Sequence, residues 1–237
     1  MDISPAGAEP HIPSFPIGME PALHAHAARL VEWSRRWRNE IGARAGALGV
    51  NLGGTLKFAL HDERLLLSAM ERGAGDERIA ELVDRLDSNW DSRGTAPFGL
   101  IRHGIYRPAE QHLHQAARDL AAAGIQGEPL DALRQAPERL RDLQLSGLPS
   151  GPNDLGRLRF AFDELMAGLQ RAARAGMAEH PEHGPLLQRA LVSAARALGQ
   201  AMQGFEAIDR LKASMARERP SADPVSHGVV DPLDRAA

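Results

Sequence analysis

Apolar side chains recur at helical spacing along most of this chain, and this periodicity restricts the chain to a small set of folds. The longest example runs from residue 187 to residue 215 without a Pro. Its apolar positions are Leu187, Leu191, Ala194, Leu198, Ala201, Phe205, Ile208, Leu211 and Met215. At 1.5 Å per residue such a helix is roughly 45 Å long. The spacing predicts a long amphipathic helix that buries one stripe against other helices.

A second helix is predicted directly before this one. Apolar residues at the same spacing lie between residues 155 and 172, and a turn over 179–185 separates the two stretches. A short connection between two long amphipathic helices favours an antiparallel pair. We therefore predict an all-α fold, a multi-helix bundle with a long C-terminal antiparallel helix pair and disordered termini.

The rest of the bundle is predicted from weaker periodicity. The expected helices cover residues 21–48, 55–72, 79–90, 108–124 and 129–145. Pro108 suits the first turn of its helix, because the missing N–H has no partner there. Pro137 is expected to divide the last of these helices.

The helical periodicity ends near both termini. Residues 1–20 form a predicted disordered Pro-rich arm, and residues 219–237 form a predicted disordered tail. The helical domain is expected over 21–218. A cluster of Gly, Pro and Ser marks a candidate internal boundary at 146–153.

Residues 89–107 interrupt the helical pattern with Gly, Pro and aromatic residues. This composition predicts an irregular connection with room for one short extended segment. Binding residues often lie on such connections over a rigid scaffold. The candidate ligand or partner pocket therefore consists of Trp90, Arg93, His103, Tyr106 and Arg107. Alternatively, the apolar residues of the segment only anchor it to the core.

Composition excludes several classes of function. The absence of Cys excludes disulfide scaffolds, thiolate nucleophiles and Cys-ligated metal centres. The formal net charge of -3 gives no general attraction to nucleic acid. No apolar run is long enough to span a membrane, and the N-terminus lacks the pattern of a Sec signal peptide. We expect a cytoplasmic protein, or one secreted without a Sec signal, that needs no cofactor.

One set of residues suggests an alternative function that uses a divalent metal. Its members are His26, His61, Asp62 and Asp131, with Asp119 as a substitute for the last. A His, a later His-Asp pair and a distant Asp resemble the pattern of the HD superfamily of metal-dependent phosphohydrolases. The resemblance implies a divalent metal ion that activates water for attack on phosphorus. The competing interpretation is a solvated helix face over residues 61–64.

Two further features favour a role in protein binding. The N-terminal arm is similar in composition to the export region of type III secreted bacterial proteins. Of the 28 Lys and Arg residues, 26 are Arg, since Lys57 and Lys212 are the only lysines. This bias is typical of a GC-rich bacterial genome, or of a protein that avoids ubiquitination inside a eukaryotic host.

These observations lead to a hypothesis about function. We expect a helical protein-interaction module, most concretely a bacterial type III secretion-associated effector or accessory protein whose partner is another protein, including one of a host. A third hypothesis is a ligand-sensing bundle with an enclosed apolar pocket beside Trp37, Trp90 or Tyr106.

Overall fold

The computed structural model describes residues 20–145 and 154–221, and every regular element within them is helical. In chain order these are α1 (Pro21–Ala47), α2 (Gly53–Glu71), α3 (Asp76–Ser88), the π-helical turn η1 (Asn89–Arg93), α4 (Thr95–Ala122), α5 (Glu128–Leu145), α6 (Asp154–Glu179), the 3-10 turn η2 (Pro181–His183) and α7 (Gly184–Glu218). The all-α prediction is therefore confirmed. Residues 1–19, 146–153 and 222–237, on which the predicted arm, internal boundary and most of the tail fall, lie outside the described residues.

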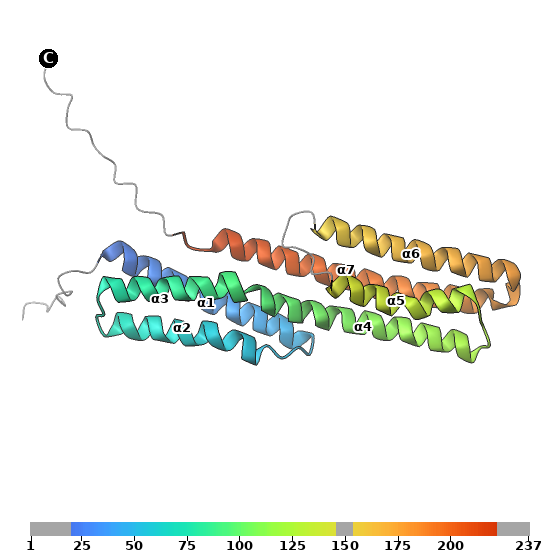
Figure 1. Ribbon diagram of the computed structural model, residues 1–237, viewed down its shortest axis with the longest axis horizontal. Helices are drawn as coiled ribbons and strands as arrows, with labels where there is room; N and C mark the ends of the chain where they lie inside the picture. The colour runs from blue at the N-terminus through green and yellow to red at the C-terminus, as the bar shows by residue number, and fades with distance from the viewer. Residues whose placement is uncertain (1–19, 146–153, 222–237) are drawn as a thin grey trace, which may run out of the picture.

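The helices form an elongated bundle with two groups arranged end to end (Figure 1). The N-terminal group consists of α1, α2, α3 and η1, and the C-terminal end of α7 lies against it. The C-terminal group consists of α4, α5, α6 and the remainder of α7. The α3–η1–α4 run and α7 extend along both groups and connect them.

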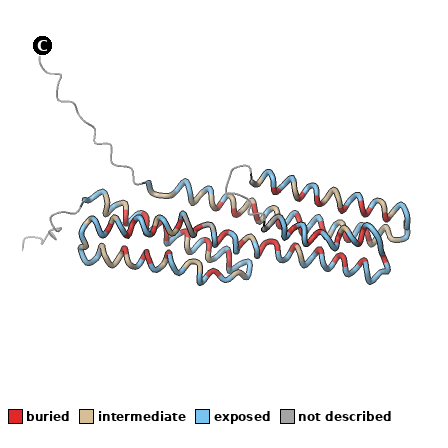
Figure 2. Tube along the Cα trace, in the orientation of Figure 1, coloured by how far each residue is buried: buried red, intermediate tan, exposed pale blue. Residues whose placement is uncertain are grey.

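The two last helices, α6 and α7, are in contact and are connected by the turn η2. Figure 1 shows α6 running to the turn η2 and α7 returning beside it. The buried positions of α7 include Leu187, Ala194, Leu198, Ala201, Phe205, Ile208 and Leu211. Figure 2 shows that such buried positions follow the inner side of the helices. Four of the nine buried positions on α7 are Ala, so neighbouring helices approach closely.

The expected irregular connection over 89–107 is wrong, because this segment is helical. The π-helical turn η1 passes into α4, which buries Phe98, Ile101 and Tyr106. Gly104 does not mark a turn. A Cβ at this position would lie 2.4 Å from Cγ2 of Val50, so glycine allows α4 to pack against the α1–α2 connection. Burial of the apolar side chains outweighs the low helix propensity of the Gly and Pro residues.

Two prolines that were predicted to begin or divide helices lie inside continuous ones. Pro108 is inside α4, and Pro137 is inside α5. A proline within a helix costs about 3 kcal/mol, because it removes one backbone hydrogen bond and crowds the preceding turn. Buried side chains flank each proline, including Leu113 on α4 and Leu133 and Leu140 on α5. Their burial offsets that cost.

None of the helices among the described residues combines the length and apolarity that a membrane span requires.

Candidate functional site

The four residues of the predicted pocket whose side chains the structure describes do not meet at one surface. Trp90 in η1 and Tyr106 in α4 are buried in the core, whereas His103 and Arg107 are exposed on α4. Arg93 lies in η1, and its side chain is outside the described part of the structure. Because the segment is helical, it distributes these side chains around a helix axis and does not direct them toward one cavity.

The residues of the predicted metal site are also separated. His61 is exposed on α2 while Asp62 beside it is buried, His26 is half-buried on α1, and Asp119 and Asp131 are exposed. Within 20–145 and 154–221, one group of three His, Asp or Glu residues has ligand atoms within 4.8 Å of one another, and it contains none of these five residues. No observation therefore favours a phosphohydrolase site built from them.

A buried polar network lies in the N-terminal group and was missed from the sequence. The Ser34 hydroxyl donates a hydrogen bond of 2.8 Å to Oε1 of Glu63, and the indole Nε1 of Trp90 donates one of 2.7 Å to Oγ of Ser34. Arg38 binds the same carboxylate through Nε and Nη2, each at 3.1 Å from a different oxygen. The Glu63 side chain is only 2% exposed, so its charge is stabilised by these donors and not by water.

Asp62 forms a second part of this network. Its carboxylate accepts a hydrogen bond from the side-chain amide of Asn89, and Oδ1 lies 2.9 Å from Nε of Arg85 in an ion pair. The predicted solvated face over residues 61–64 is therefore wrong for Asp62 and Glu63. Both residues lie on the inner side of α2, where they contact partners on α1, α3 and η1.

The network is suited to holding helices in place. The polar atoms of Ser34, Glu63 and Trp90 are occupied by one another and by Arg38. A buried ionic network of this kind fixes the orientation of the helices that supply it, since every other arrangement leaves a charge unpaired. The π-helical turn η1 contributes two adjacent residues, Asn89 and Trp90, to the network.

Side-chain contacts hold the C-terminal end of α7 against the N-terminal group. Arg219 lies beyond the last turn of α7, and its guanidinium binds the carboxylates of Asp87 and Asp91 and lies over the ring of Trp33, 5.7 Å from the centroid. The side-chain hydrogen bond from Arg219 lowers the pKa of Asp91 below its usual value. Residues 219–221, the first residues of the predicted tail, are thus part of the described structure.

Tyr106 is not available as a general base. Its ring packs on Phe205 with the centroids 4.8 Å apart, and burial raises the pKa of its phenol to about 12. The nearby cation of Arg102 opposes this rise but does not cancel it. The phenol therefore stays neutral at physiological pH.

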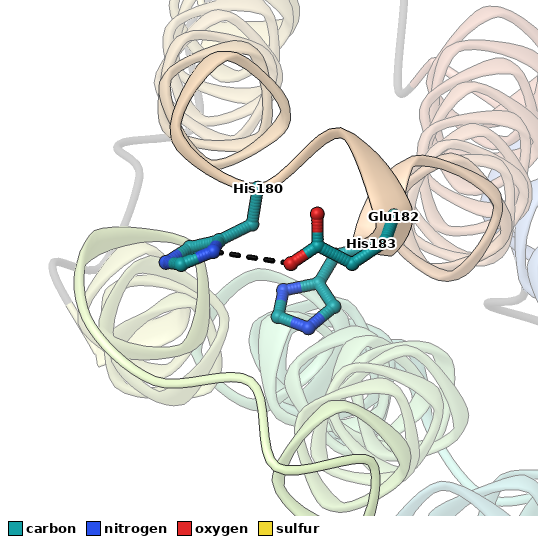
Figure 3. A group of neighbouring side chains, drawn as sticks. All are labelled: His180, Glu182 and His183. Carbon is teal, nitrogen blue, oxygen red and sulfur yellow. Dashed lines mark hydrogen bonds and ion pairs between the residues drawn. The ribbon is translucent and has the colours of Figure 1, made fainter.

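The turn between α6 and α7 brings together the residues best suited to hold a metal. His180, Glu182 and His183 place their ligand atoms within 4.8 Å of one another (Figure 3). Nδ1 of His180 lies 3.2 Å from Oε1 of Glu182. A hydrogen bond from its own backbone N–H, together with the neighbouring His180, lowers the pKa of Glu182, so the carboxylate is ionised. The sequence signal for this group is Pro181, which ends the helix and starts a tight turn between the two histidines.

A groove of about 300 Å³ follows the outer side of the α6–α7 pair. Its lining is Met166, Gln170, Arg174 and Met177 from α6, and Gln188, Leu191, Val192 and Ala195 from α7. Val192 is about half exposed. Methionine side chains are flexible and adapt to different apolar partners, so this lining suits a protein surface.

Comparison with known proteins identifies no relative. No protein family, curated protein or solved structure matches this chain. Three features of the described residues offer distinct chemistry: the buried network, the His-Glu-His turn and the α6–α7 groove. The polar groups of the buried network are bonded to one another, the turn offers metal ligands, and the groove offers an open apolar surface.

Proposed function

We propose that this protein is a helical protein-interaction module that binds an acidic amphipathic helix of another protein in the α6–α7 groove. The observation that carries the proposal is the groove itself, which is lined by apolar and amide side chains and by one charged residue, Arg174. An amphipathic helix laid in such a groove buries its apolar stripe against the floor and keeps its polar side in water.

The charges around the groove favour an acidic partner. Arg189 and Arg196 are exposed on α7, three residues before and four residues after Val192, and so lie on the same face as this groove residue. Together with Arg174 they form no ion pair within the described part of the chain. In addition, α7 has no Asp or Glu between Gly184 and Phe205. Carboxylates on a partner helix would pair with these guanidinium groups.

Binding to synthetic peptides tests this proposal. The first probe is a stapled amphipathic helix of about 18 residues with a Leu stripe flanked by Glu, and the second has Lys in place of each Glu. We expect fluorescence anisotropy to give a Kd at least about tenfold lower for the Glu peptide than for the Lys peptide. Equal affinities for the two peptides would contradict the proposed charge complementarity.

A matched pair of variants locates the binding surface. Arg174→Glu places a carboxylate in the groove, whereas Arg107→Glu makes the same change at an exposed position on α4. We expect Arg174→Glu to weaken binding of the Glu peptide by about tenfold and Arg107→Glu to leave it within about twofold. If both variants weaken binding equally, only the overall charge of the protein attracts the peptide.

The more specific form of the proposal is a type III secretion-associated effector or accessory protein. It is supported by the composition of residues 1–20 and by the excess of Arg over Lys. Fusion of residues 1–50 to a translocation reporter tests it, with a strain that lacks the type III apparatus as the control. Secretion that continues in that strain would contradict this form of the proposal and leave the peptide-binding form intact.

A further inference from the structure

We propose that the turn between α6 and α7 is a binding site for one divalent transition-metal ion of the zinc class, held by His180, Glu182 and His183. This site is separate from the α6–α7 groove and does not depend on the proposed function. The inference rests on the local backbone, on the spacing of the ligand atoms and on the chemistry of the three donors.

The backbone of the turn directs the three side chains to one place. The N–H of His180 still donates to the carbonyl of Gly176 at 2.9 Å, as in the last turn of α6. Pro181 has no N–H with which to extend the hydrogen-bond pattern of α6, and the N–H of His183 donates to the carbonyl of His180 at 3.0 Å, which closes a 3-10 turn. His180 precedes this turn and His183 ends it, which leaves the two imidazoles side by side. Their ring centroids are 5.1 Å apart.

The spacing of the donor atoms is close to that of a metal site. Zinc binds His nitrogen and carboxylate oxygen at about 2.0–2.2 Å, so two ligands of a tetrahedral ion lie about 3.3 Å from each other. Nδ1 of His180 and Oε1 of Glu182 are 3.2 Å apart, which matches this edge. The ligand atoms of all three residues lie within 4.8 Å of one another (Figure 3), so a tetrahedral set requires only that His183 move closer to the other two.

The donor set determines the class of metal. Two imidazoles and one carboxylate suit Zn²⁺, Co²⁺, Ni²⁺ and Cu²⁺, whereas Mg²⁺ and Ca²⁺ prefer sets made only of oxygen ligands. His180 and Glu182 are exposed and His183 is half-buried, so an ion reaches the site directly from solvent. Three protein ligands leave the remaining coordination position to water.

Calorimetric titration of the tag-free full-length chain with Zn²⁺ tests the proposal, and Mg²⁺ serves as the comparison ion. We expect one Zn²⁺ per chain and no measurable binding of Mg²⁺. Co²⁺ in place of Zn²⁺ should give visible absorption bands typical of a tetrahedral nitrogen and oxygen site. Binding of Mg²⁺ as tight as that of Zn²⁺, or no 1:1 zinc complex, would overturn the proposal.

Two double variants with equal loss of His distinguish this site from scattered surface histidines. The variant His180→Ala with His183→Ala removes both imidazoles of the turn, and the variant His112→Ala with His114→Ala removes two exposed imidazoles of α4. We expect the first to weaken Zn²⁺ binding by at least about 100-fold and the second to change it by less than about twofold. Circular dichroism should show full helicity in both, because all four side chains lie outside the core. Equal zinc affinity in the two double variants would overturn the assignment.

Zinc should also stabilise the protein through this turn. An ion that binds only the folded chain raises the thermal midpoint Tm, and the stabilisation grows with the logarithm of the ion concentration above its Kd. We expect Zn²⁺ to raise the Tm of the wild type and of the His112→Ala, His114→Ala variant, but not that of the His180→Ala, His183→Ala variant. A rise of equal size in all three would place the bound zinc elsewhere.

Discussion

The two helix groups differ in what fills their cores. The buried polar and charged residues among those described, Ser34, Asp62 and Glu63, all belong to the N-terminal group. In the C-terminal group the buried side chains of α5 and α6 and those of α4 beyond Tyr106 are Ala, Leu, Phe and Pro. The core of the first group therefore holds paired charges as well as apolar side chains, whereas the core of the second group is apolar and its ion pairs, such as Arg159 with Glu206, lie nearer the surface.

This difference shows that apolar packing and buried charge pairs specify different aspects of the fold. An apolar core is tolerant of exchanged side chains as long as volume is conserved, and it loses uniqueness before it loses stability. A buried carboxylate is not, because any arrangement that separates Glu63 from Arg38 leaves a charge without a partner. The network thus fixes α1, α2 and α3 relative to one another, while the small residues of the C-terminal group fix the distance between its helices.

The largest expected effect comes from breaking the network. Glu63→Ala removes the acceptor of Ser34 and leaves the Arg38 guanidinium, which is about one-fifth exposed, without its carboxylate. We expect a loss of about 3–5 kcal/mol in the free energy of unfolding, measured by urea denaturation. Glu63→Gln keeps an acceptor for Ser34 and should lose less. If the Ala variant loses less than about 1 kcal/mol, the network does not contribute to stability as described.

The ionisation of Tyr106 sharpens the contrast, because burial keeps this group neutral. Tyr106 is the only tyrosine, so absorbance near 295 nm reports it alone. We expect a titration midpoint at a pH of about 12 in the folded protein. Because the pKa is raised on folding, the contribution of Tyr106 to stability is complete below pH 10, the usual pKa of a tyrosine in the unfolded chain. This contribution is lost as the pH rises through about 12. A native midpoint near 10 would show that the phenol is hydrated.

The packing of the C-terminal group can be broken by a single methyl group. A Cβ on Gly176 would lie 2.5 Å from Cγ of Pro129 and 3.3 Å from Cδ1 of Leu187. We therefore expect Gly176→Ala to lower the free energy of unfolding by about 1–3 kcal/mol, despite the better helix propensity of Ala. Gly199→Ala, where nothing lies within 4 Å of the added Cβ, should raise it by about 0.5–1 kcal/mol. Thermal unfolding of both variants measures the difference, and equal shifts would contradict close packing at Gly176.

The smallest effect on the free energy of unfolding is expected at the contact between the end of α7 and the N-terminal group. Arg219→Ala removes the ion pairs to Asp87 and Asp91 and should cost about 0.2–1 kcal/mol, because exposed pairs are weakened by solvent. The pKa of Asp91 is lowered, so the contribution of its ion pair with Arg219 to stability is complete above the usual pKa of 3.8 and is lost as the pH falls below this value. We expect the stability difference between variant and wild type to shrink in acid and in high salt. A difference that is the same at pH 3 and pH 7 would exclude an electrostatic origin.

The fold could be predicted where the evidence is local. The spacing of apolar residues from Leu187 to Met215 belongs to one continuous stretch of sequence, and it correctly predicts α7. The state of residues 89–107 depends instead on a distant contact, since Gly104 is required by Val50, which is 54 positions earlier. A lone glycine looks the same in the sequence whether it ends a helix or admits a neighbour.

The candidate sites show the same limit. Burial of Glu63 depends on Ser34 and Arg38, which lie 29 and 25 residues away on another helix. The sequence alone gives no means of pairing these residues among many other acids and arginines. The His-Glu-His turn, by contrast, is local and was within reach once Pro181 is taken as the start of a 3-10 turn. Sites formed by a single turn can be predicted in this way, and sites formed between helices require the structure.

Methionine methyl spectroscopy tests most directly the central claim that the C-terminal group carries the binding surface. The chain has seven methionines, of which Met166 and Met177 line the groove, while Met70 and Met215 belong to or lie against the N-terminal group. With ¹³C-methyl-labelled protein and the Glu-flanked peptide, we expect the Met166 and Met177 signals to shift in proportion to saturation and the Met70 and Met215 signals to stay in place. Shifts confined to Met70 and Met215, or no shift at Met166 and Met177 under saturating peptide, would contradict that claim.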